Sequence, residues 1–144
     1  SIWPVKMEPD THIWISSKFG VRRSPFNKKR WEKHNGLDIS SRYGTPLVAT
    51  ADGTIADIGK DRYLGNFIEI RHSDKFSTLY GHMCRFAKGM KKGTKVKRGD
   101  VIGYMGKTGR ATGSHVHYEV RVNGNPVNPA DYILNRRPST RGKE

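Results

Sequence analysis

Short stretches in which apolar and polar residues alternate recur along the chain and predict half-buried β-strands. Six of them are residues 45–50, 53–58, 66–71, 76–82, 100–104 and 115–122. Dipeptides that favour tight turns, such as Asp52-Gly53 and Asn123-Gly124, separate several of these stretches. No window of about 12 residues carries the apolar period of an amphipathic helix, and only residues 129–134 tolerate a short one. We therefore expect an all-β, mainly antiparallel fold, built as a sandwich or barrel.

The length and the cysteine content narrow the class of protein. The chain has 144 residues, which fits one ordinary domain. No apolar run approaches the roughly 18 residues that a membrane-spanning helix needs, so no transmembrane segment is expected. Cys84 is the only cysteine, which excludes a disulfide scaffold and a paired-thiol redox site. The chain begins at Ser1 without a signal-like segment, and we interpret it as a mature or trimmed fragment.

A large excess of positive charge points to an anionic partner. The sequence has 27 Lys and Arg against 13 Asp and Glu, a net charge of +14. Three segments hold this excess, residues 18–33, 88–98 and 135–144, so the predicted strands are close to neutral. An acidic polymer, an acidic membrane surface or a nucleic acid would each fit such charge. No recognised nucleic-acid-binding motif accompanies it, so we expect no nucleic-acid partner.

Histidines are placed in patterns that suit a metal site. His115 and His117 lie two apart in a predicted strand, so they share one face with Glu119 beyond them. In the segment His34-Asn35-Gly36-Leu37-Asp38, the Asn-Gly pair permits a tight turn that brings His34 and Asp38 together. His82 ends another predicted strand, and Cys84 would share its face if that strand continued.

Zinc binds imidazole nitrogen and carboxylate oxygen, and a catalytic zinc uses three protein ligands. His34, Asp38 and one histidine of the His115/His117 pair would supply such a set. The other histidine of the pair and His82 would then be free for proton transfer. The spacing leaves a second arrangement open, in which both strand histidines bind the same metal and form a closed, inert structural site.

These segments, with several others in the same order, resemble the lysostaphin-like, LytM-type zinc metallopeptidases that cut bacterial peptidoglycan. The resemblance covers about residues 15–134. Its motifs include Phe19-Gly20-Val21-Arg22, His34-Asn35-Gly36-Leu37-Asp38, Tyr80-Gly81-His82, Gly106-Lys107-Thr108-Gly109, Gly113-Ser114-His115-Val116-His117 and Pro126-Val127-Asn128-Pro129. Several linked motifs in one order make the resemblance specific.

The resemblance implies a lysostaphin-like, duplicated-hybrid-motif fold with long loops lining a groove. It implies that His34, Asp38 and His117 bind one Zn²⁺ and that His82 and His115 are the catalytic pair. The bond cut would be an amide in a stem peptide or cross-link of peptidoglycan. Family members often use a tyrosine as an additional oxyanion donor, and the motifs do not assign its position here. We divide the chain into a lead-in segment (1–14), a peptidase domain (15–134) and a basic tail (135–144).

Two functions remain open at this point. Some relatives of this fold have lost metal ligands and act by binding and activating separate cell-wall amidases. The complete set of five residues favours an active zinc endopeptidase over such a regulator. We expect a monomer in the cell envelope, periplasmic or exported, with peptidoglycan as its anionic partner.

Overall fold

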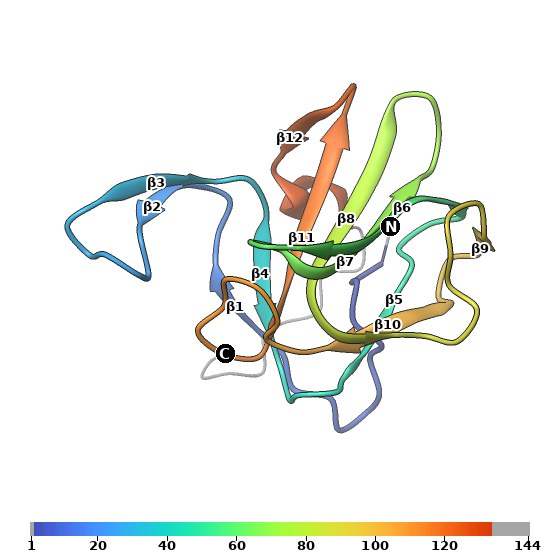
Figure 1. The fold of residues 1–144 in the computed structure, drawn as a ribbon, viewed down its shortest axis with the longest axis horizontal. Coiled ribbons are helices and arrows are strands. Elements are labelled where there is room, and N and C mark those ends of the chain that lie inside the picture. Colours follow the sequence, from blue (N-terminus) through green and yellow to red (C-terminus); the bar gives the residue numbers. More distant parts are fainter. Residues whose placement is uncertain (1, 134–144) are drawn as a thin grey trace.

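The computed structural model describes residues 2–133, and nearly all their regular structure is antiparallel β-sheet (Figure 1). The main sheet has ten strands, with the order β1-β4-β11-β8-β7-β6-β9; β10 joins it at β8, β5 pairs with β10, and β12 pairs with β11. A two-stranded sheet is formed by β2 and β3. Within the described part, the helical structure is a short 3-10 helix, Pro129–Tyr132, and the predicted all-β, mainly antiparallel fold is confirmed.

The strands are β1 (Trp14–Ser17), β2 (Gly20–Arg23), β3 (Trp31–His34), β4 (Leu37–Ser40), β5 (Pro46–Val48), β6 (Gly53–Asp61), β7 (Gly65–Arg71), β8 (Phe76–Phe86), β9 (Lys95–Val96), β10 (Val101–Met105), β11 (His115–Val122) and β12 (Asn125–Val127). Each of the six predicted strands overlaps one of these. Strands β1 to β4, β9 and β12 were not predicted. Each is at most four residues long, so it offers too few alternating positions to be recognised.

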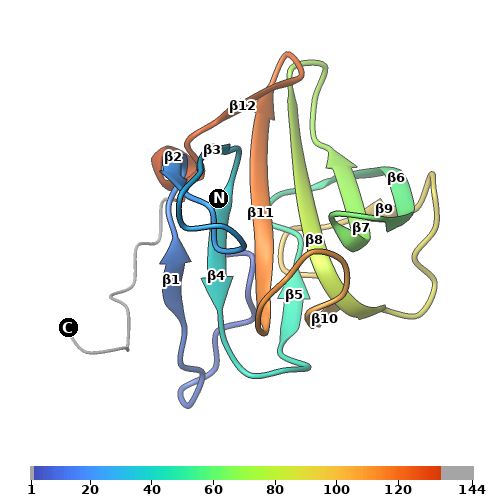
Figure 2. The same cartoon turned by 60° about the vertical axis from the view of Figure 1, so that its left-hand side comes forward.

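The hydrophobic core lies against one face of β4, β11 and β8, which run side by side (Figure 2). Alternation along β11 sends Val116, Tyr118 and Val120 into this core. The rings of Tyr80 and Tyr118 meet edge to face there, with centroids 5.2 Å apart. The predicted lead-in segment contributes as well, because its residues Val5 and Ile13 are buried in the same cluster.

The opposite face of these strands is polar and forms the floor of a cleft. In the register of β4 and β11, Asp38 lies opposite His117, and Ser40 lies opposite His115. Directly opposed residues on neighbouring antiparallel strands point to the same face, so these side chains come together on the side away from the core. The pairing of β4 with β11 therefore places Asp38, His115 and His117 on one face of the sheet.

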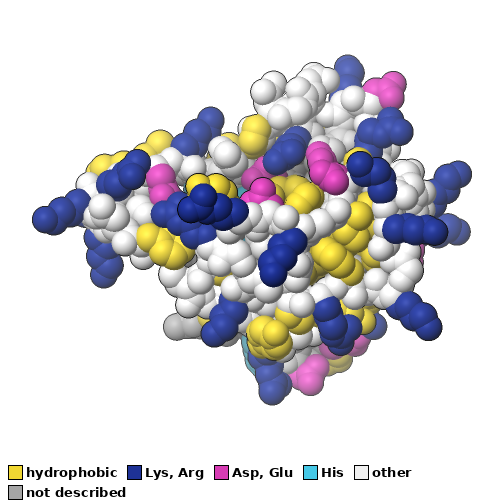
Figure 3. Space-filling model, viewed as in Figure 1, with side chains coloured by type: hydrophobic (Ala, Val, Ile, Leu, Met, Phe, Trp, Pro, Cys, Tyr) yellow, Lys and Arg dark blue, Asp and Glu magenta, His cyan; other side chains and the backbone are white. Residues whose placement is uncertain are grey.

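The β2–β3 hairpin projects from the main sheet and carries much of the basic segment 18–33 (Figure 1). Lys and Arg side chains cluster around this hairpin and around the loop that carries β9 (Figure 3). The loop holds the second basic segment, 88–98, whose lysines and arginine are exposed. The third, 135–144, lies outside the described residues, as does Leu134 at the predicted domain boundary. No helix in the described part is long and apolar enough to cross a membrane.

Candidate metal centre

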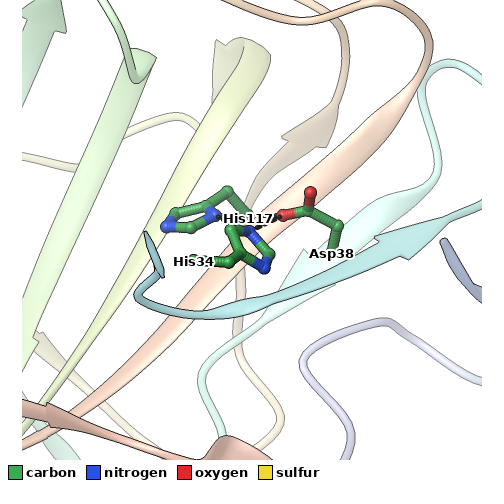
Figure 4. A group of neighbouring side chains, drawn as sticks. All are labelled: His34, Asp38 and His117. Atoms are coloured by element: carbon green, nitrogen blue, oxygen red, sulfur yellow. Dashed lines mark hydrogen bonds and ion pairs between the residues drawn. The ribbon is translucent and has the colours of Figure 1, made fainter. Parts of the chain in front are cut away.

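Three side chains from different strands bring their donor atoms to one point (Figure 4). His34 Nε2 lies 3.0 Å from Asp38 Oδ1 and 3.2 Å from His117 Nδ1, and the latter two atoms are 3.0 Å apart. Donors bound tetrahedrally to zinc at about 2.0–2.1 Å are about 3.4 Å from one another. The triangle of donor atoms is therefore close to one face of a zinc coordination tetrahedron, and the residues fit that metal.

Chain connectivity and sheet register produce this arrangement. His34 is the last residue of β3, and Asp38 is the second residue of β4, paired with His117 of β11. The Asn35-Gly36 segment does not close a hairpin, because β3 pairs with β2 and β4 pairs with β1 and β11. It passes directly against β11 instead: a Cβ added at Gly36 would lie 2.6 Å from the Tyr118 carbonyl oxygen and 2.9 Å from His117 Cε1.

We predict that Gly36→Ala weakens metal binding at least about tenfold and lowers the free energy of unfolding by about 1–3 kcal/mol. The added methyl must displace either the backbone of β11 or the imidazole of His117. Zinc titration against a chromogenic chelator and thermal unfolding would measure the two effects. Gly113→Ala is the control, because this glycine lines the cleft close to His115 but a Cβ there meets nothing within 4 Å. Wild-type zinc affinity in Gly36→Ala would contradict this account.

A second layer of hydrogen bonds orients the three donors. His34 Nδ1 donates to the Lys18 carbonyl oxygen at 2.8 Å, and His117 Nε2 donates to Glu119 Oε2 at 2.7 Å. The remaining nitrogens, His34 Nε2 and His117 Nδ1, are the ones that converge. Arg22 Nη1 donates to Asp38 Oδ2 at 3.3 Å, which leaves Oδ1 for the centre. Such partners fix ring orientation in metal sites.

The electrostatics of the metal-free centre follow from these contacts. Burial alone would raise the pKa of Asp38, but hydrogen bonds from His117 and His34 hold it well below its usual range. Burial alone would lower the pKa of His117, but its hydrogen bonds to Asp38 and Glu119 raise it to about 9. At neutral pH the metal-free centre thus holds a proton on His117 between two carboxylates.

His82 and His115 lie beside this centre, with ring centroids 4.6 Å apart. His82 Nδ1 donates to the Thr108 carbonyl oxygen at 2.7 Å, and His115 Nδ1 donates to the Gly113 carbonyl oxygen at 3.0 Å. Their Nε2 atoms are left for other partners, and that of His115 is 3.8 Å from Asp38 Oδ2. Burial, with a contribution from His115, lowers the pKa of His82 to about 4, so this ring is neutral at pH 7.

The backbone of His82 changes the course of β8. Its φ is +66°, in the left-handed region that few residues other than glycine adopt. As a result Tyr80 and Met83, three residues apart, both face the core, and the alternation of faces shifts at His82. The expectation that Cys84 shares the site's face assumed an unbroken alternation; Cys84 lies beside the exposed Tyr43 instead. Among the described residues, the metal-binding cluster does not include Cys84.

A cleft of about 690 Å³ is lined by all five predicted site residues, His34, Asp38, His82, His115 and His117. Part of the β2–β3 hairpin and residues 110–114 line this cleft. Several lining residues were not identified from the sequence: Arg22, Phe26, Tyr63 and Arg110. Tyr63 is the one tyrosine along the lining of the described cleft, so it is the candidate for the unassigned oxyanion donor. Arg22 lies within a recognised motif, whereas the other three have no local sequence signal.

Comparison with known proteins gives a consistent picture. The model of the family described as "Peptidase family M23" matches residues 32–129. The DD-carboxypeptidase/endopeptidase Mpg of Neisseria meningitidis is 43% identical over 128 residues, covering 89% of this chain and 29% of the relative. The peptidoglycan DD-endopeptidase ShyA of Vibrio cholerae is 43% identical over 119 residues, covering 83% of this chain and 27% of the relative.

A solved zinc-containing peptidase from Vibrio cholerae superimposes with a TM-score of 0.77 at 37% identity. The match covers 88% of this chain and 37% of that one. The chain therefore spans less than a third of the length of the two curated relatives and little more than a third of this structure.

Proposed function

Because the chain belongs to peptidase family M23, we propose that it is a zinc-dependent endopeptidase that hydrolyses amide bonds in peptidoglycan stem peptides or cross-links. The observation that carries the proposal is the convergence of His34, Asp38 and His117 in a cleft that also holds His82 and His115. The names of the relatives, Mpg and ShyA, support the substrate and the reaction. The chain matches only part of the length of these relatives, so the activity of the whole protein belongs to the same proposal.

We assign His34 Nε2, Asp38 Oδ1 and His117 Nδ1 as the zinc ligands. Bound zinc would act as a Lewis acid and lower the pKa of a water molecule. Three protein ligands are the number found in catalytic zinc sites, whereas structural sites have four. The alternative in which His115 also binds the metal is less well supported, because the described metal-binding cluster contains only His34, Asp38 and His117, and His115 Nδ1 is hydrogen-bonded to the Gly113 carbonyl oxygen.

We assign proton transfer to the Nε2 atoms of His115 and His82. Each ring is held by a hydrogen bond from Nδ1 to a carbonyl oxygen, so Nε2 can accept the proton of the attacking water and pass it to the leaving amine. The low pKa of His82 keeps it in the accepting form at neutral pH. The Tyr63 hydroxyl would donate a hydrogen bond to the carbonyl oxygen of the scissile amide as charge develops there.

A regulator that only binds cell-wall amidases would not need this complete set of oriented donors, and the set therefore favours the enzyme. A peptidoglycan hydrolase acts outside the cytoplasm, so we place the protein in the cell envelope, periplasmic or exported. We also propose that the domain acts as a monomer, because all five site residues come from one chain. The exposed basic segments would help to retain it on an anionic wall.

Digestion of defined cross-linked peptidoglycan fragments, with products identified by mass spectrometry, tests the proposal. The zinc-loaded protein should cut an amide in the peptide part and leave the glycan intact. Treatment with a chelator should stop cleavage, and added zinc should restore it. If the zinc-loaded protein leaves every fragment uncut, the proposed activity is wrong.

Metal binding should depend on pH because it requires an unprotonated His117 Nδ1. The pKa of this ring is raised to about 9 in the metal-free protein, so binding below that pH must release its proton. We predict that the apparent zinc affinity rises about tenfold per pH unit from pH 7 and levels off near pH 9. The stability of the metal-free protein depends on pH in the opposite direction to its zinc affinity. The protonated His117 ring stabilises the fold at low pH, and this contribution disappears as the pH rises through about 9.

Competition titrations with a chelator at several pH values would measure this dependence. Glu119→Gln is the informative variant, because it removes one carboxylate that raises the pKa of His117. Its zinc affinity should therefore level off at a lower pH than that of the wild type. An affinity that stays constant between pH 7 and 9 in the wild type would contradict the prediction.

A further inference from the structure

Two arginines line the cleft, and their surroundings differ. Arg22 is paired with two carboxylates: it donates to Asp38 Oδ2 through Nη1, which also donates to Ser17 Oγ, and to Glu32 Oε2 through Nη2. Arg110 is exposed, and its guanidinium lies over the ring of Phe26, 4.2 Å from the centroid. Within the described residues Arg110 forms no ion pair with a carboxylate. The cleft thus contains a cation that no described carboxylate neutralises.

The loop that carries Arg110 is fixed in place. The Arg110 amide donates to the Tyr63 carbonyl oxygen at 2.8 Å. Two residues earlier, the Thr108 hydroxyl donates to the Met83 carbonyl oxygen at 2.7 Å and accepts from the backbone amide of Asn66 at 3.0 Å. The carbonyl oxygen of Thr108 also holds the ring of His82. Arg110 is therefore anchored on the side of the cleft where the proposed proton-transfer histidines lie.

Stacking on Phe26 prepares Arg110 for a particular ligand. A guanidinium packed flat on an aromatic ring has fewer rotamers to lose, while the N–H groups at its edge remain able to bind a planar anion with two hydrogen bonds. The carboxylates of the cleft are already engaged: Asp38 and Glu32 with Arg22, and Glu119 with His117 and Arg121. None of the described carboxylates that line the cleft is therefore free to pair with Arg110.

From this geometry we propose that Arg110 is a specificity-determining residue that binds a free carboxylate of the substrate. We assign the carboxylate to the residue that supplies the leaving amine, because the loop that carries Arg110 also holds His82 through the Thr108 carbonyl oxygen, and His82 is one of the two histidines proposed to protonate that amine. The inference rests on the proposed function and narrows its substrate class. A cross-link through the side-chain amine of a diamino acid with a second carboxyl group has such a carboxylate, whereas a glycine bridge has none.

Lys33 also borders the cleft, but its position in the hairpin makes it a weaker candidate. It pairs with Val21, which is 74% exposed, on the face of the hairpin opposite to that of Arg22 and Glu32. Alternation along β3 therefore turns its ammonium group outward, whereas Glu32 and His34 turn inward. A variant of Lys33 therefore tests whether another cation near the cleft binds the substrate carboxylate in place of Arg110.

The test compares two synthetic cross-linked peptide dimers that differ in one group, a free carboxylate or a carboxamide on the amine-side residue. The zinc-loaded wild type should show a kcat/KM about 10 to 100 times higher for the acid than for the carboxamide, the range expected for a charge-assisted hydrogen bond. In Arg110→Gln the ratio should fall to about one through loss on the acid substrate. Zinc content and the thermal melting temperature should match those of the wild type.

Arg62→Gln is the matched control. Arg62 also lies over an aromatic ring, that of Tyr63 at 5.6 Å, but does not line the cleft, so this variant should keep the wild-type ratio. The inference is wrong if Arg110→Gln keeps the preference, if it lowers both rates equally, or if Lys33→Gln abolishes the preference instead. Failure of the proposed function would look different, because the zinc-loaded wild type would then cut neither dimer.

Discussion

Asp38→Ala should abolish both metal binding and peptidoglycan hydrolysis, and it should also destabilise the metal-free fold. Asp38 Oδ1 contacts His34 and His117, while Oδ2 accepts from Arg22. The substitution removes the carboxylate that pairs with the protonated His117 ring and with Arg22 Nη1, in a site that is largely buried. Removal of one partner from such a buried charge cluster typically lowers the free energy of unfolding by about 3–5 kcal/mol.

Zinc content after dialysis, fragment digestion and denaturant unfolding would measure the three effects of Asp38→Ala. Asp74→Ala is a suitable control, because the Asp74 side chain is fully exposed and only reaches Arg71 at 3.8 Å. This control should retain zinc, activity and stability. Stoichiometric zinc in dialysed Asp38→Ala would show that the carboxylate is not a ligand.

His115→Ala should have a different signature: activity falls about 10²- to 10⁴-fold while zinc remains bound. The reason is that His115 lies next to the three converging donors without belonging to them, and its ring is held by the Gly113 carbonyl oxygen. Single-turnover cleavage of a soluble cross-linked dimer, together with metal analysis of the same sample, would measure both properties.

His12→Ala is the control for His115→Ala, since His12 is an exposed histidine that does not line the cleft. Two outcomes would contradict the assignment. Normal cleavage by His115→Ala would exclude His115 from proton transfer. Loss of zinc from His115→Ala would make His115 a metal ligand. It would favour the alternative in which His115 and His117 both bind the metal in a structural site.

The sequence predicted the parts of the fold in which apolar and polar residues alternate. The period of two in β11 correctly separated His115, His117 and Glu119 from the core residues between them. The same rule missed β4 because that strand has only four residues, too few for its alternation to be recognised. Cys84 would share the face of His82 only in a strand that alternates without a break, and the left-handed residue His82 shifts the faces of β8.

The walls of the cleft could not be predicted from local sequence. Phe26 and Arg110 are far apart in the chain and meet only because the fold brings two separate loops together at the cleft. Tyr63 likewise reaches the cleft through a turn that is hydrogen-bonded to Arg110. Such contacts depend on the packing of whole elements, which a pattern of neighbouring residues does not encode.

The small sheet formed by β2 and β3 has a thermodynamic consequence. Its orientation relative to the cleft floor depends on a few contacts, namely those of His34, Arg22 and Phe26. His34 lies at the end of β3, so a metal held there ties the hairpin to β4 and β11. Metal binding would therefore stabilise the packing of the hairpin against these strands, and by reciprocity a substrate that favours this packing would also raise the affinity for the metal.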